Sequence, residues 1–140
     1  MNVSRKMAVV DAIHRLLSQK IDASVSTLVG LTESRNTASK STAGDKHETG
    51  RAMMEAEIGR AEQQLQKAKV LRNELKNLPW SIQNLAGPGA LIQTNHGEFL
   101  MSVGLGKIEV DSEMCFALSG GSPLGQALMG RKEGDHVSFQ

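Results

Sequence analysis

Two acidic residues three positions apart are the first in this sequence whose types and spacing suggest chemistry. Asp45 and Glu48 stand in "STAGDKHETGRAMMEAE", residues 41–57, after a turn-like segment and before a stretch with apolar periodicity. Two carboxylates about one helical turn apart can share a hard divalent cation such as Mg²⁺. Two carboxylates alone bind Mg²⁺ weakly, so the remaining ligands would belong to a partner, where the cation could orient water for attack on a phosphodiester.

The same two acids also fit a helix cap. Asp at the N-cap followed three residues later by Glu is close to a capping box, and acids near a helix N-terminus suit its dipole. The spacing therefore leaves a cap and a metal site both open. His47, between the acids, could add a ligand for a transition metal, but adjacent side chains on a helix point apart, which favours an exposed polar residue.

Cys115 is the only thiol, and with His96 or His136 it could suggest a nucleophile. Nothing in the spacing supports that geometry, and the chain is far too short for the thiolase-like fold of ketoacyl synthases. We interpret Cys115, within the apolar run "EMCFAL", as a small buried hydrophobic residue. The segment "GLGK" (104–107) lacks the rest of a phosphate loop, and we interpret it as a hairpin turn.

Two apolar stripes with spacings of three and four predict helices over 4–35 and 46–77. Ser and Thr are frequent after Ser24 and weaken helix propensity there, so we expect the first helix to end near Arg35. The stripes are Val3, Met7, Val10, Ile13, Leu17, Ile21, Val25 and Leu28, and then Met54, Ile58, Ala61, Leu65, Ala68, Leu71, Leu75 and Leu78.

The polar segment "NTASKSTAGD" (36–45) joins these two helices, and neither can bury its stripe alone. We therefore predict an antiparallel coiled-coil hairpin, with Ile21 near the region 61–68. At about 1.5 Å per residue, each helix makes an arm of roughly 45 Å. The acids Asp45 and Glu48 would then lie at the free tip.

After Pro79, Gly-rich turn signals separate short runs of strand length, which predicts strands at 90–94, 98–103 and 107–118. Ser122 is the expected N-cap of a short helix that begins at Pro123 and stops at Gly130, with Leu124 and Leu128 facing the sheet. A last strand, "DHVSF" (135–139), is expected to follow. The predicted fold class is α+β, with a helical hairpin at 1–78, a linker at 79–82 and a small sheet domain at 83–140.

The composition narrows the function classes. Charged residues make up 22% of the chain and the net charge is +1, which disfavours a DNA-wrapping role. Aromatic residues are 3%, which leaves few platforms for direct reading of RNA. No stretch approaches the roughly 20 apolar residues of a membrane span. We expect no membrane association, no export signal and a reducing, cytoplasmic location, which a single cysteine also fits.

Two stretches resemble the Gre transcript-cleavage factors. "GDKHETGRA" is similar to their acidic tip, Gly-Asp-Leu-x-Glu-Asn-Ala-Glu-Tyr, and "GSPLGQALMGRKEGDHVSF" is similar to their C-terminal signature. The resemblance covers nearly the whole chain in order: arm, tip and FKBP-like sheet domain. The second stretch is the more specific, because it matches the signature at Ser122, Pro123, Leu124, Leu128, Gly130, Gly134, Asp135 and Val137.

This resemblance implies a protein that docks its globular domain at the secondary channel of bacterial RNA polymerase and threads the arm to the catalytic centre. The tip acids, matched by Asp45 and Glu48, would help hold a Mg²⁺ shared with the polymerase and stimulate its cleavage of backtracked RNA. The polymerase would remain the enzyme, and the RNA 3′ end would be approached only indirectly. Ser122, Pro123 and Leu124 would belong to the docking surface, although Ser122 and Pro123 also suffice as cap and first helical residue.

The chain departs from the Gre pattern in two places. Thr49, Gly50, Arg51 and Ala52 replace the family's Asn-Ala-Glu-Tyr, which removes an acid and adds a cation. A Gre-like regulator that occupies the channel without promoting cleavage is therefore the alternative, and a coiled-coil adaptor without a polymerase role is a third hypothesis. The sequence stops at Gln140, one strand before Gre domains usually end, so we expect either a truncated chain or an unpaired sheet edge.

Overall fold

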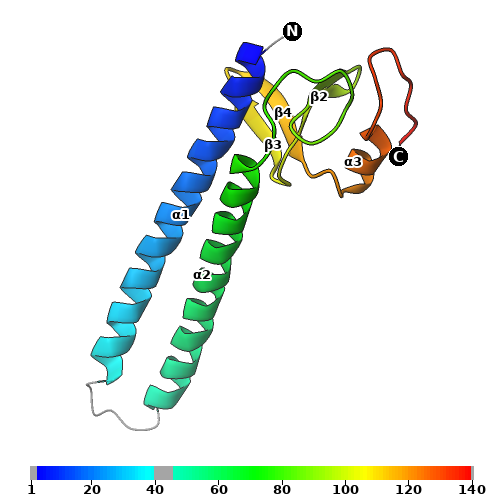
Figure 1. Ribbon diagram of the computed structural model, residues 1–140. Helices are drawn as coiled ribbons and strands as arrows, with labels where there is room; N and C mark the ends of the chain where they lie inside the picture. Colours follow the sequence, from blue (N-terminus) through cyan, green and yellow to red (C-terminus); the bar gives the residue numbers. More distant parts are fainter. Residues whose placement is uncertain (1–2, 40–45, 140) are drawn as a thin grey trace. The chain divides into compact units, whose positions relative to one another are not determined.

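The computed structural model describes residues 3–39 and 46–139, which form two long helices, a four-stranded sheet and a short helix (Figure 1). The predicted α+β class is confirmed. The elements are α1 (Val3–Ser39), α2 (Lys46–Lys76), β1 (Leu91–Thr94), β2 (Gly97–Met101), β3 (Gly106–Val110), β4 (Glu113–Leu118) and α3 (Pro123–Leu128).

The chain divides into two compact units. One combines Met1–Arg15 with Leu71–Gln140, and the other is Leu16–Val70. Both divisions fall inside helices, so the ends of α1 and α2 belong to the same unit as the sheet. This division does not test where an independently folding domain begins, and the linker at 79–82 therefore stays a prediction.

In the second unit, α1 and α2 run antiparallel beside each other (Figure 1). The predicted helical hairpin is confirmed. Ile21, Ala61 and Ala68 are all buried in this unit, as the predicted packing requires. Arg35 and Glu55 form an ion pair with an Nη1–Oε1 distance of 3.3 Å. The first helix continues to Ser39, four residues past the expected end, so the weak helix propensity of its Ser and Thr residues does not end it there.

Only part of the first predicted apolar stripe is buried. Met7 and Val25 are 36% and 43% exposed, whereas the neighbouring Lys6 and Ser24 are buried. Near its N-terminus α1 buries adjacent positions, including Val9 and Val10, so its buried face is wider there than a single stripe. The second stripe has no exposed member over residues 54–78.

The sheet has the order β1-β2-β4-β3, with β2 and β4 parallel and the outer pairs antiparallel. The single strand predicted at 107–118 is wrong, because the chain reverses at Asp111 and Ser112, whose φ angles are 52° and 66°. Two successive positive φ values are typical of a tight hairpin turn, here built without glycine. The hairpin predicted at 104–107 is also wrong, since β4 lies between β2 and β3.

The predicted last strand at 135–139 is wrong as well. These residues pair with no strand, and all but the half-buried Val137 are exposed. Instead, Lys132 forms an isolated antiparallel bridge with Leu85. Two apolar residues in five gain too little burial to hold a strand, because a strand of the sheet is stabilised by its neighbours more than by propensity.

Candidate functional site

The predicted acidic tip consists of Asp45 and Glu48. Asp45 is outside the described residues, and so is the side chain of Glu48, although its backbone belongs to the first turn of α2. The choice between cap and metal site therefore stays open, and the role of His47 stays untested. Among the side chains that the structure describes, no group of three or more His, Cys, Asp or Glu could hold a metal ion. Arg51, three residues after Glu48, is exposed.

The second candidate surface begins at Ser122, whose predicted cap is confirmed. The Ser122 Oγ accepts a hydrogen bond from the Gly125 N–H at 3.0 Å and donates to the Ser119 carbonyl at 2.8 Å. Pro123 is the first helical residue, and Gly130, with a φ of 79°, follows the end of the helix. The cap alone thus accounts for a serine at position 122.

One side of α3 is turned inward. Gly125 and Leu128 are buried and Leu124 is half-buried, whereas Pro123 and Gln126 are exposed. A Cβ at position 125 would lie 2.2 Å from the Ser119 carbonyl oxygen, so the backbone approach there requires glycine. Ser122, Pro123 and Leu124 are therefore brought together, with Pro123 available to a partner.

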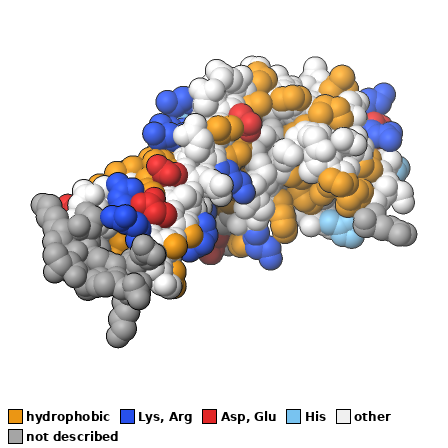
Figure 2. All heavy atoms as spheres, turned by 90° about the horizontal axis from the view of Figure 1, so that it is seen from below, with side chains coloured by type: hydrophobic (Ala, Val, Ile, Leu, Met, Phe, Trp, Pro, Cys, Tyr) orange, Lys and Arg blue, Asp and Glu red, His pale blue; other side chains and the backbone are white. Residues whose placement is uncertain are grey.

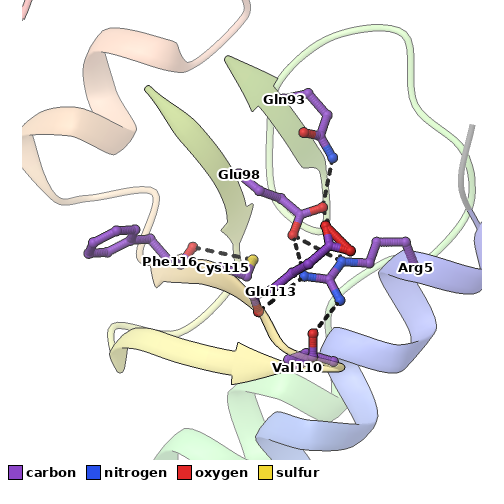
Figure 3. A network of polar contacts seen from close by, with 7 residues as sticks. All are labelled: Arg5, Gln93, Glu98, Val110, Glu113, Cys115 and Phe116. Carbon is purple, nitrogen blue, oxygen red and sulfur yellow. Dashed lines mark hydrogen bonds and ion pairs between the residues drawn. The ribbon is translucent and has the colours of Figure 1, made fainter. Parts of the chain in front are cut away.

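An ion pair that the sequence analysis missed joins α1 to the sheet (Figure 3). Arg5 donates to the Glu98 carboxylate from Nη2 at 2.8 Å and from Nε at 3.0 Å. Its Nη1 donates to the Val110 carbonyl at 2.8 Å, and Gln93 Nε2 donates to the second carboxylate oxygen of Glu98 at 2.7 Å. The hydrogen bond with Glu98 raises the pKa of Arg5, despite the opposing effect of burial.

A weak sequence signal for this ion pair exists. Glu98 and Leu100 are two positions apart in β2, so their side chains lie on the same face of the sheet, and both residues are buried. The alternation of side chains between the two faces of a strand thus assigns position 98 to the core. A charged side chain buried there requires a partner of opposite charge or hydrogen bonds. The sequence does not indicate which cation supplies it, because Arg5 is 93 residues away.

Lys6 makes a second polar contact between the N-terminal helix and the segment after α2. Its Nζ donates to the Ser81 carbonyl at 2.9 Å, and burial lowers the pKa of this lysine. Arg5 and Lys6 therefore fix the first turns of α1 to two different segments of their compact unit.

Cys115 is fully buried, which confirms its structural interpretation. Burial is the main cause that raises its pKa to about 12, and the nearby Glu98 carboxylate adds to the shift. The thiol is therefore protonated at neutral pH and is a poor nucleophile. Its Sγ lies 4.0 Å from the Phe116 carbonyl, whereas His96 and His136 are exposed.

Replacing Arg5 by Met is expected to lower the free energy of unfolding by about 3–5 kcal/mol, because it leaves the Glu98 carboxylate buried without its cation. The two side chains are only 11% and 9% exposed. Urea denaturation measures the change. The double variant Arg5→Met/Glu98→Leu should recover most of the loss, since apolar replacement of a buried pair is often close to neutral.

The matched control is Arg35→Met, which removes the Arg35–Glu55 pair, whose side chains are 35% and 51% exposed. Such exposed pairs contribute about 0–1 kcal/mol. Equal losses for Arg5→Met and Arg35→Met, or no recovery in the double variant, would contradict this role of Arg5.

Comparisons with protein-family models, curated proteins and solved structures found no match to this chain. Within residues 3–39 and 46–139, neither long helix has the length and apolar character needed to cross a membrane. The function is therefore inferred from the order of the helices and the sheet along the chain, and from two groups of residues: Asp45 with Glu48, and Ser122 with Pro123 and Leu124.

Proposed function

We propose that this chain binds bacterial RNA polymerase, inserts its helical hairpin into the secondary channel and stimulates cleavage of backtracked transcripts. The observation that carries the proposal is the order of its parts. Antiparallel helices of 37 and 31 residues precede a small sheet and a serine-capped helix that begins at proline. In the sequence, Asp45 directly precedes the second helix and Glu48 is its third residue. This order is the one that the Gre resemblance implies, with an FKBP-like sheet domain as the finer fold assignment.

The length of the helices supports the role of an arm. At about 1.5 Å per residue, α2 alone is roughly 45 Å long. Acids that only cap a helix would not require a helix of this length. In this proposal Asp45 and Glu48 are carried at its tip into the catalytic centre of the polymerase. The Mg²⁺ shared with the polymerase would neutralise phosphate charge and activate water there. The chain contributes two carboxylates, and the polymerase remains the enzyme.

The proposed docking surface is the start of α3. Pro123 is exposed, Ser122 and Leu124 are half-buried, and the buried Gly125 and Leu128 hold the helix in place. A partner could thus contact Pro123 and Leu124 without disturbing the core. The protein would act in the cytoplasm, where the polymerase is found.

Arg51 favours a second candidate function. Its exposed side chain belongs to the next turn of the same helix as Glu48, where a cation can offset the charge of an acid. This arrangement favours a Gre-like regulator that occupies the channel without promoting cleavage. In a coiled-coil adaptor, the third possibility, the acids would only cap α2 and polymerase would not bind.

Binding to the purified polymerase of the same host tests the proposal. The full chain is expected to bind at micromolar concentration or tighter, and Pro123→Glu is expected to weaken binding by about tenfold or more by placing a charge in the interface. The measurement is a titration monitored by fluorescence anisotropy of labelled protein.

His96→Glu is the matched control, because it adds the same charge at an exposed turn between β1 and β2. It should bind like the wild type. Absence of wild-type binding at micromolar concentration would favour the adaptor, and equal binding by the Pro123 and His96 variants would exclude α3 as the docking surface.

A further inference from the structure

β3 is an edge strand with a free side. It pairs with β4 on one side, and no other strand among the described residues pairs with it. Ser102 donates to the Leu118 carbonyl, which faces β2, and Leu105 donates to the Ala117 carbonyl, which faces β3. Because backbone groups alternate in direction along a strand, Lys107 and Glu109 must turn their N–H and C=O groups toward the free side.

The side chains of these two residues are exposed and lie on the same face of the sheet, since they are two positions apart. An antiparallel pairing of β3 with a second β3, centred on Ile108, places Lys107 opposite the partner's Glu109. By symmetry, Glu109 lies opposite the partner's Lys107. Each of these pairs would exchange two backbone hydrogen bonds, and each would join opposite charges.

We propose that two copies of this chain associate through β3, joining their sheets into one across a two-fold axis at Ile108. The opposite charges of Lys107 and Glu109 favour a second copy of this chain as the partner of the edge. An edge lysine without a compensating acid repels a second copy, which is how many edge strands avoid association. Here the acid at position 109 converts that repulsion into two attractive pairs, so the edge is complementary to itself in the antiparallel register.

Apolar surface beside this edge extends the same face. Met114 and Phe116, the β4 neighbours of Glu109 and Lys107, are 45% and 38% exposed. The Lys107 ammonium lies 5.7 Å from the centre of the Phe116 ring, and the rings of Phe116 and Phe99 are also 5.7 Å apart. Figure 2 shows hydrophobic side chains at the surface of the compact unit that contains the sheet. Pairing at β3 would bring two such faces into one continuous surface.

Exchange of the two charges tests the proposal by sedimentation velocity of the protein alone. Wild-type protein is expected to dimerise with increasing concentration. Lys107→Glu places Glu opposite Glu in both pairs, and Glu109→Lys places Lys opposite Lys, so each should weaken the dimer by about tenfold or more. The double variant Lys107→Glu/Glu109→Lys restores opposite charges in both pairs and should restore dimerisation.

Lys132→Glu and Glu133→Lys are matched controls, because both residues are exposed and lie outside β3. They should dimerise like the wild type, and thermal melting checks that all variants are folded. A wild-type monomer at concentrations up to about 1 mM would overturn the proposal, because even a weak pairing would be populated there. A dimer unaffected by the single charge reversals, or a double variant that stays monomeric, would also overturn it. The outcome does not depend on polymerase binding.

Discussion

Replacement of Leu128 by Asp is expected to unfold the compact unit that contains the sheet. Leu128 is 7% exposed and is one of the two buried residues of α3. Loss of a buried leucine alone costs about 2–5 kcal/mol, and an unpaired carboxylate in its place adds a desolvation penalty. Because a whole domain is stable by only about 5–15 kcal/mol, the cooperative transition should disappear or shift far below that of the wild type.

The fluorescence of Trp80, the only tryptophan in the chain, provides the measurement, because this residue belongs to the same compact unit as the sheet. Gln126→Asp is the matched control, since Gln126 is exposed on the same short helix. It should change the melting temperature little. A cooperative melting transition retained by Leu128→Asp would show that α3 contributes nothing to the core of this unit.

Asp45→Asn and Glu48→Gln are expected to abolish cleavage stimulation while leaving binding to polymerase nearly intact. Each change removes an anionic ligand but preserves size and much of the hydrogen bonding. If the acids only cap α2, neither variant should differ from the wild type in RNA cleavage or in stability, because Asn caps a helix as well as Asp. RNA cleavage in backtracked complexes, together with competition for polymerase binding, separates the two interpretations.

The two long helices could be predicted from the sequence because their apolar periodicity extends over many turns. The second helix begins at Lys46 as expected and ends one residue before the predicted Asn77. The cap at Ser122 could be predicted for a different reason: the serine and the following proline act locally, so their effect does not depend on distant residues.

The errors occurred where distant contacts decide the structure. The turn at Asp111 and Ser112 contains no glycine, so the sequence did not indicate that one apolar run contains two strands. The ion pair between Arg5 and Glu98 joins residues 93 positions apart, and no local pattern identifies that pairing. Burial of Ser24 in place of Val25 depends on how the two helices approach each other.

The sequence predicts the docking residues of the candidate site better than it predicts the role of the two acids. The residues of the proposed docking surface are adjacent in the chain, so Ser122, Pro123 and Leu124 had to lie together. The spacing of Asp45 and Glu48 is equally compatible with capping and with metal binding, and no side-chain geometry at the tip distinguishes the two. The difference between them is chemical, and it depends on groups that a partner would supply.

The most direct test of the proposed function is RNA cleavage in stalled, backtracked polymerase complexes across a Mg²⁺ titration. Wild-type protein, Asp45→Asn and Glu48→Gln would be compared at concentrations that saturate the polymerase. The proposal predicts that wild-type protein accelerates cleavage and that both variants bind without accelerating it. Equal cleavage with all three proteins would contradict a catalytic role for the acids, and binding without acceleration by the wild type would identify a regulator that only occupies the channel.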